Sequence, residues 1–168
     1  MAPLNDAGAV VAVGRFACDA MHKGLARWLR AAGHDAWWKY GVDDRELVEF
    51  ARRVQRIVLT SDAGVMERRA VKRHEVGALF LPRELDPLGA ARLVLATFAL
   101  KVQFPRCMAC GGRLDPLDRD AARAVIPPRT YAWLDEFFQC ERCGKHFWRG
   151  THWTRIEQAL ASLVRGAQ

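Results

Sequence analysis

The sequence predicts an α/β domain with a mostly parallel sheet, followed by a small cysteine-containing module. Two observations carry this prediction. Up to about residue 100, short apolar runs typical of buried strands alternate with amphipathic segments typical of helices. Beyond that point prolines interrupt the alternation and two pairs of cysteines appear. A chain of 168 residues accommodates one domain of ordinary size with a small appendage.

The first strand is expected in residues 9–18, an unbroken apolar run that suits a strand buried on both faces. A helix should begin at Asp19, because apolar residues then recur with helical spacing. This apolar stripe consists of Met21, Leu25, Trp28, Leu29 and Ala32. The basic residues Lys23, Arg27 and Arg30 are expected on the opposite face of the helix.

The rest of the first domain continues the alternation. Further strands are expected at 35–40, 56–62 and 76–82, and further helices at 42–54, 63–74 and 86–100. A last short helix is expected at 154–168. We therefore divide the chain into an N-terminal extension with the start of the first strand (1–13), the α/β domain (14–100), the ribbon module (101–156) and a C-terminal helix or tail (157–168).

Acidic residues follow two of the expected strands and open one of the helices. Asp19 and Asp62 come directly after apolar runs, and Asp43 and Asp44 begin the second helix. The carboxyl ends of parallel strands meet at one edge of a sheet, where ligands bind, so these side chains should share that edge. Each could instead be a helix cap, since Asp is among the best capping residues. Taken together, however, clustered carboxylates need a cation, and oxygen ligands select Mg²⁺ or Mn²⁺, which can activate water for phosphodiester hydrolysis.

The two cysteine pairs have the spacing of metal-binding knuckles. Cys107 and Cys110 form one Cys-x-x-Cys pair, and Cys140 and Cys143 form the other. Four thiolates are the tetrahedral set that suits structural Zn²⁺, and a closed site of this kind performs no chemistry. The long interval between the pairs should hold a hairpin-like excursion. The fifth cysteine, Cys18, lies in the first strand and is expected to be a buried thiol.

The charge of the chain favours an anionic partner. It carries 26 Lys and Arg against 19 Asp and Glu, a net charge of +7. Basic and aromatic residues also alternate after the last knuckle, a combination that binds single-stranded nucleic acid. The alternative is that the tryptophans there pack the ribbon module against the first domain. The candidate nucleic-acid-binding residues are Lys23, Arg27, Arg30, Lys145, Trp148, Arg149 and His152.

The N-terminus has no basic leader, and no stretch approaches the ~18 consecutive apolar residues of a membrane span. We therefore expect a cytoplasmic protein without a membrane partner. Cysteines in a reducing compartment also favour metal over disulfides.

Four motifs resemble those of the MUT-seven C-terminal RNase domain family, a PIN-like nuclease fold joined to a zinc ribbon. They are FACDAMHKGLARWLRAAGHDA, DDRELVEFARRVQRIVLTSD, FPRCMACGGRL and FFQCERCGKHFWRGTHWTR, in the family's order over residues 14–156. The resemblance implies a three-layer α/β/α domain and metal-dependent RNA cleavage. The acids that it matches are Asp19, Asp43 or Asp44, and Asp62. The chain departs from the family pattern at His22 and Lys23, at Ser61 where Arg is common, and at Gly111 where Asn is frequent.

We therefore expect a Mg²⁺- or Mn²⁺-dependent ribonuclease acting on single-stranded RNA. Asp19, Asp44 and Asp62 would hold the metal, and Asp43 could substitute for Asp44. One alternative is a non-catalytic RNA-binding protein that keeps the fold and the ribbon, and a weaker one is a nuclease that acts on DNA. A protein inhibitor is a conceivable partner that leaves no mark in the sequence, and nothing in the sequence indicates an oligomeric state.

Overall fold

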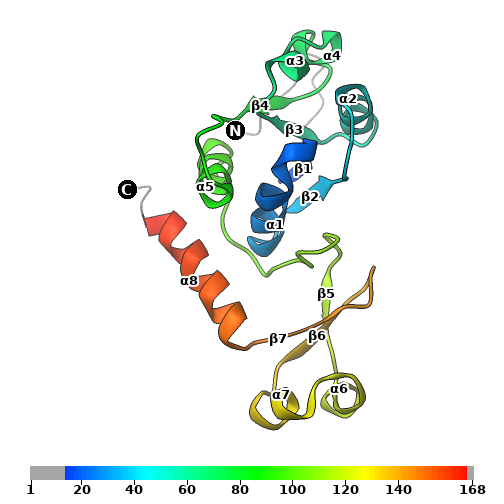
Figure 1. Cartoon of the computed structure of the whole chain (residues 1–168), viewed down its shortest axis with the longest axis vertical. Helices are drawn as coiled ribbons and strands as arrows, with labels where there is room; N and C mark the ends of the chain where they lie inside the picture. The colour runs from blue at the N-terminus through cyan, green and yellow to red at the C-terminus, as the bar shows by residue number, and fades with distance from the viewer. Residues whose placement is uncertain (1–13, 166–168) are drawn as a thin grey trace.

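The computed structural model describes residues 14–165, and its first domain is built on a parallel sheet (Figure 1). The strands are β1 (Arg15–Cys18), β2 (Asp35–Trp38), β3 (Ile57–Thr60) and β4 (Ala78–Phe80). They lie in the order β2-β1-β3-β4, and every neighbouring pair is parallel. The predicted parallel α/β sheet is confirmed. Residues 9–13 of the expected first strand lie outside the described residues.

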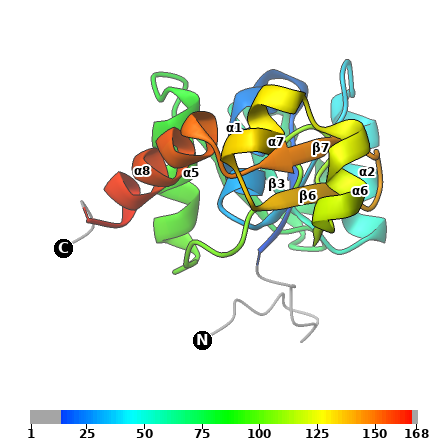
Figure 2. The same ribbon diagram turned by 90° about the horizontal axis from the view of Figure 1, so that it is seen from below.

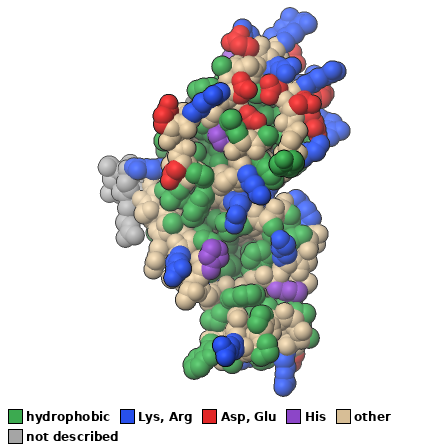
Figure 3. Space-filling view, in the orientation of Figure 1, with side chains coloured by type: hydrophobic (Ala, Val, Ile, Leu, Met, Phe, Trp, Pro, Cys, Tyr) green, Lys and Arg blue, Asp and Glu red, His purple; other side chains and the backbone are tan. Residues whose placement is uncertain are grey.

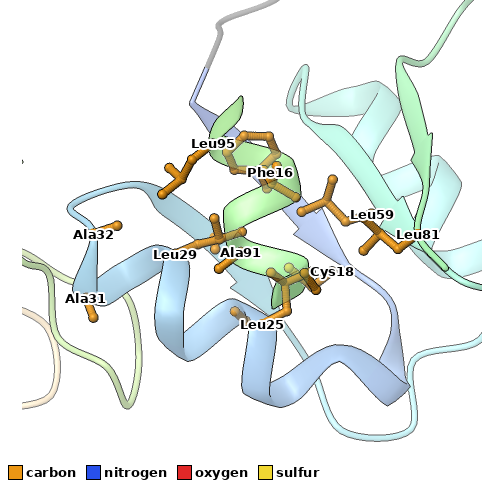
Figure 4. Close-up of a cluster of buried hydrophobic side chains, with 14 of the residues drawn as sticks. Phe16, Cys18, Leu25, Leu29, Ala31, Ala32, Leu59, Leu81, Ala91 and Leu95 are labelled. Carbon is orange, nitrogen blue, oxygen red and sulfur yellow. The ribbon is translucent and has the colours of Figure 1, made fainter. Parts of the chain in front are cut away.

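Helices cover both faces of this sheet. On one face lie α1 (Lys23–Ala31) and α5 (Pro87–Thr97), and on the other lies α2 (Asp44–Arg53). Side chains alternate along the strands, so that Phe16 and Cys18 join the first core cluster and Ala17 joins the second. Figure 4 shows the first cluster, in which strand side chains meet those of α1 and α5.

The segment expected as one helix at 63–74 forms two short helices. They are α3 (Ala63–Met66) and α4 (Arg69–Lys72). Arg68 separates them, because its backbone angles of −59° and 135° are not helical. Cys18 is a buried thiol as expected, and burial raises its pKa to about 12, which makes it unreactive.

The ribbon module is a three-stranded antiparallel sheet with the order β5-β6-β7 (Figure 1). Its strands are β5 (Leu114–Pro116), β6 (Phe137–Cys140) and β7 (His146–Trp148). The interval between the cysteine pairs is not a simple hairpin, because it contains α6 (Arg119–Val125) and α7 (Pro128–Trp133). These two helices pack on the ribbon through a small cluster that includes Ile126 and Phe137.

The last helix, α8 (Thr151–Arg165), returns to the first domain. It begins three residues before the expected start and crosses the expected boundary between residues 156 and 157. Leu160 and Leu163 are buried in the same cluster as α1 and α5, and Figures 1 and 2 both show α8 on the α5 side of the molecule. Among residues 14–165, no helix has the length and apolar character needed to cross a membrane.

Candidate active site and metal centre

The acids predicted to act together lie at the carboxyl end of the parallel sheet. Asp19 follows β1, Asp62 lies two residues beyond the end of β3, and Asp44 begins α2 after β2. From β1 the chain crosses to β2 on one side, and β3 pairs with β1 on the other. Such a reversal of strand order opens a crevice at the carboxyl edge, the usual ligand site of parallel α/β sheets. We call the three residues Asp19, Asp44 and Asp62 the acidic edge.

Asp19 is not a side-chain helix cap. It precedes a 3₁₀ turn, η1 (Ala20–His22), but its side chain makes no capping hydrogen bond. Instead, the hydroxyl of Thr60 donates to Asp19 Oδ2 over 2.6 Å, and Thr60 Oγ1 accepts from the N–H of Asp62 over 2.9 Å. Thr60 is fully buried and Asp19 is 8% exposed. One hydroxyl therefore joins the ends of β1 and β3 and orients the Asp19 carboxylate.

The two consecutive acids at the start of α2 have different roles. Asp43 Oδ1 accepts from the N–H of Glu46 over 2.8 Å, which makes Asp43 the N-cap of α2. Asp44 turns toward α3: a Cβ built on Gly64 would lie 3.8 Å from Asp44 Oδ2 and 3.1 Å from Asp62 Oδ1. Because Gly64 carries no side chain, space remains between these two carboxylates. Asp62 also caps α3, since its Oδ1 accepts from the N–H of Gly64 over 2.7 Å.

The acidic edge is gathered less closely than the four cysteines. Its three carboxylates do not all come within 4.8 Å of one another, a spacing that only the four cysteine sulfurs reach within residues 14–165. Arg68 partly neutralises the edge, with its guanidinium 3.5 Å from Asp44 Oδ2. Figure 3 shows acidic side chains gathered over the end of the molecule that carries α2, α3 and α4. The donor set consists of carboxylate oxygens and fits Mg²⁺ or Mn²⁺ in chemical type.

Two of the positions that depart from the family pattern contact each other beside Asp19. His22 Nε2 lies 3.0 Å from Ser61 Oγ. Burial lowers the pKa of His22, and the Asp19 carboxylate opposes that shift. Arg83 Nε donates to the carbonyl of Ser61 over 3.1 Å. Sequence reasoning identified His22 and Ser61 as separate departures; only the structure shows that they are partners.

The four cysteines of the ribbon module converge on one point. The Sγ atoms of Cys107 and Cys143 are 3.7 Å apart, and those of Cys110 and Cys140 are 3.5 Å apart. Thiolates at ~2.3 Å around a tetrahedral Zn²⁺ lie about 3.8 Å from each other. Burial raises the pKa of the Cys110 thiol to about 12, whereas at Cys140 the N–H groups of Cys143 and Arg142, together with the thiols of Cys110 and Cys143, outweigh burial and lower the pKa to about 7. The set is thus positioned to hold a metal ion and is consistent with zinc.

Arg30 does not lie on the exposed basic face where we expected it. Its side chain is buried, 4% exposed, and spans the two parts of the molecule. Arg30 Nε donates to the carbonyl of Ala36 over 2.7 Å, while its Nη1 donates to the carbonyls of Met108 and Ala109, within the first cysteine knuckle. Gly111, with φ +82°, lies so close that a Cβ would be 3.2 Å from Arg30 Nε. Arg30 therefore holds the knuckle against α1.

The other candidate RNA-binding residues face a common cavity of about 1060 Å³. Lys23 and Arg27 line it from α1, and the ribbon side contributes the rest: Lys145, Trp148, Arg149 and His152. Trp148 also packs on the cluster under α6 and α7, and Trp153 stacks on Phe138 at 5.3 Å. Both rings therefore pack within the ribbon module, rather than between it and the first domain as the alternative supposed, and they also line the cavity.

A parallel α/β domain with acids at the carboxyl edge, joined to a four-cysteine ribbon, defines the class of protein. A family model described as the Mut7-C RNAse domain matches residues 14–160. The chain belongs to the Mut7-C RNAse domain family, as its motifs predicted. It is also similar to a human protein named exonuclease mut-7 homolog, with 39% identity over 104 residues. That match covers 57% of this chain and 11% of the human protein, so the chain corresponds to a small part of that relative. No solved structure matches.

Proposed function

We propose that the chain is a metal-dependent ribonuclease with a PIN-like catalytic domain. The observation that supports this proposal best is the acidic edge at the switch point of the sheet, with Asp19 oriented by Thr60. Asp19, Asp44 and Asp62 would hold Mg²⁺ or Mn²⁺. Such an ion supplies charge for the phosphate and lowers the pKa of water for attack on the phosphodiester.

The residues around the edge have distinct tasks in this proposal. Thr60 holds one oxygen of Asp19 and leaves the other free for the cation. Gly64 leaves the space between Asp44 and Asp62 open, which any larger residue would narrow. Arg68 balances part of the charge of Asp44, from which its guanidinium is 3.5 Å away.

The ribbon module has a supporting role. Its four thiolates leave no open position for substrate, so zinc there stabilises the fold without performing chemistry. The module would bind RNA next to the acidic edge, since it supplies basic residues to the cavity that α1 also lines.

A cleavage assay tests the proposal. Purified protein is incubated with labelled single-stranded RNA and with DNA of the same sequence, with or without added Mn²⁺. We expect cleavage of the RNA only, and only with Mn²⁺. Asp19→Asn should reduce the rate by more than ~100-fold, because even outer-shell changes at metal sites cost 10–100-fold.

A matched control is the same substitution at another helix start. Asp86 caps α5 away from the acidic edge, and Asn caps helices equally well, so Asp86→Asn should cleave like the wild type. Metal-dependent RNA cleavage that persists in folded Asp19→Asn protein would refute the site assignment. Equal cleavage of DNA would refute the choice of RNA.

One observation favours a second candidate, a non-catalytic RNA-binding protein. In this structure Asp44 is paired with Arg68, and Asp62 is engaged as a cap, so both carboxylates already have partners. Salt-sensitive RNA binding by the wild type, without cleavage in Mg²⁺ or Mn²⁺, would support this alternative.

A further inference from the structure

A groove separates the first domain from the ribbon module. We define it by the cavity of about 1060 Å³ between α1, the loop at 102–106, β7 and α8. In Figure 1 this region lies between α1 and α8, above β7. Figure 3 shows Lys, Arg and His side chains standing among apolar ones over this part of the surface, away from the acidic end.

Aromatic rings form much of the groove surface. Trp38 lies on the first-domain side, and Trp148 and Trp153 lie on the ribbon side. Between them Phe104 is 50% exposed, with its ring 5.3 Å from Phe138. The three tryptophans are half-buried, and cations already lie over two of them: Lys23 Nζ is 5.3 Å from the ring centroid of Trp38, and Arg149 Cζ is 5.6 Å from that of Trp153. The solvent-facing parts of the rings offer flat apolar surfaces to a ligand, whose bases would displace these cations. Nucleobases stack on such faces with little regard to sequence.

Positive charge that is not neutralised by an acidic side chain lies on both sides of these rings. Lys23 and Arg27 project from α1 and Lys145 from the ribbon, and all three are exposed. None of them forms an ion pair with another residue in the described range 14–165. Arg149 is different, since it pairs with Glu136 over 3.4 Å and approaches Glu157 at 4.0 Å. A ligand that is complementary to this groove therefore carries flat aromatic rings along a negatively charged backbone.

The groove also leads to the acidic edge. Lys23 begins α1 directly after η1, which itself follows Asp19. Trp38 Nε1 donates to the carbonyl of Ala20 over 2.9 Å, so the groove wall is tied to the residue next to Asp19. The nine residues of α1 extend over ~13 Å, which limits this wall to a few nucleotides.

We propose that the groove binds a short unpaired segment of RNA, which rests on the proposed ribonuclease function. Its bases stack on Trp38, Trp148 and Trp153, and its phosphates contact Lys23, Arg27 and Lys145. The strand leaves the groove past Lys23 and brings the bond to be cleaved to the acidic edge. A cavity of this volume is close to that of small-ligand sites and suits a few unpaired nucleotides better than a double helix.

Charge reversal tests the phosphate contacts. Binding of a labelled uridine dodecamer is measured at several salt concentrations without added divalent metal, so that no cleavage is needed. The triple variant Lys23→Glu, Arg27→Glu, Lys145→Glu should bind at least ~100-fold more weakly. Its slope of log affinity against log salt should fall by about 2, because each phosphate contact on a single strand contributes about 0.7.

A matched triple variant controls for overall charge. Arg113, Arg129 and Arg155 are exposed and outside the groove, so their replacement by Glu changes net charge equally. This control should stay within ~3-fold of the wild type. Equal weakening of RNA binding in both triple variants would overturn the proposal that the groove binds RNA. The proposal would also be overturned if the wild type bound no unpaired RNA, or bound duplex RNA equally well. Circular dichroism and zinc content establish that each variant is folded.

Photocrosslinking tests the stacking. A uridine oligomer carrying 5-iodouridine should crosslink to peptides that contain Trp38, Trp148 or Trp153. Crosslinks confined to Trp133, which is 86% exposed and outside the groove, would overturn the proposal. Crosslinks in the groove without cleavage in any metal would refute only the proposed ribonuclease. Cleavage with crosslinks elsewhere would refute only the groove.

Discussion

The four-cysteine site and the acidic edge both gather potential metal ligands, but they differ in how completely the fold gathers them. The sulfurs converge within 4.8 Å, and backbone N–H groups and Arg30 support their knuckles. The carboxylates stand further apart, and each has another partner: the hydroxyl of Thr60 for Asp19, Arg68 for Asp44 and the N–H of Gly64 for Asp62. A structural site needs all its ligands in place, whereas a site that must bind and release substrate benefits from looser ligands.

The largest effect should follow from loss of the cysteine site. Cys110→Ser, or removal of metal by a chelator, should unfold the ribbon module, because zinc binding contributes on the order of 10 kcal/mol to modules of this kind. Metal analysis and circular dichroism measure the outcome. Cys18→Ala is the matched control and should retain one zinc per chain, since Cys18 lies in the sheet. A wild-type ribbon module that is folded without metal would contradict the conclusion that the cysteine site is structural.

The second-largest effect concerns the contact between α1 and the first cysteine knuckle. Arg30→Lys keeps the charge but loses the fork that reaches Ala36, Met108 and Ala109, and should lower the free energy of unfolding by about 3 kcal/mol. Arg27→Lys, on the exposed side of the same helix, should change it by less than ~0.5 kcal/mol. Denaturant unfolding measures both. Equal stabilities would mean that Arg30 does not hold the knuckle.

Removing the hydroxyl of Thr60 tests how strongly the acidic edge depends on the orientation of Asp19. Thr60→Val keeps the shape but removes the hydrogen bond to Asp19, so RNA cleavage should fall by ~10–100-fold. Thr60→Ser retains a hydroxyl and should recover most of the rate. A Val variant that cleaves normally would show that the orientation of Asp19 is unimportant. The readout is the initial cleavage rate in Mn²⁺.

The smallest change in stability concerns the two neighbouring acids at the start of α2. Asp43→Ala removes the cap and should lower stability by about 1 kcal/mol while cleavage persists. Asp44→Ala should have the opposite pattern, with little change in stability and loss of cleavage. Melting temperature and cleavage rate are measured on both variants. The reverse result would assign the ligand to Asp43.

Features encoded by local patterns could be predicted from the sequence. The parallel strands follow from unbroken apolar runs, and the cysteine cluster follows from two short knuckles. The choice between Asp43 and Asp44 could not be predicted, because adjacent residues at a helix start differ only in the direction of their side chains. Likewise the Cys-x-x-Cys spacing did not reveal α6 and α7, two short helices within a proline-containing interval.

Arg30 shows why longer-range features escaped prediction. Helical spacing placed it opposite the apolar stripe, but two of its three hydrogen-bond partners lie 78 and 79 residues further along the chain. No periodicity within α1 reports on what packs against that face. The prediction that Met21 belongs to the apolar stripe was wrong for a local reason. Met21 lies in η1 rather than in α1, and its side chain is 59% exposed. The link from Thr60 to Asp19 spans 41 residues and was invisible for the same reason as Arg30.

The return of α8 to the first domain affects the order in which the chain can fold during synthesis. Domains usually fold from the N-terminus as they emerge from the ribosome. Here the cluster around Phe16 and Leu29 is completed by Leu160 and Leu163, which are made only after the whole ribbon module. Until then the nascent first domain exposes apolar surface beside α1 and α5. If synthesis stalled within the ribbon module, the nascent chain would therefore expose the incomplete core of its first domain to chaperones and proteases.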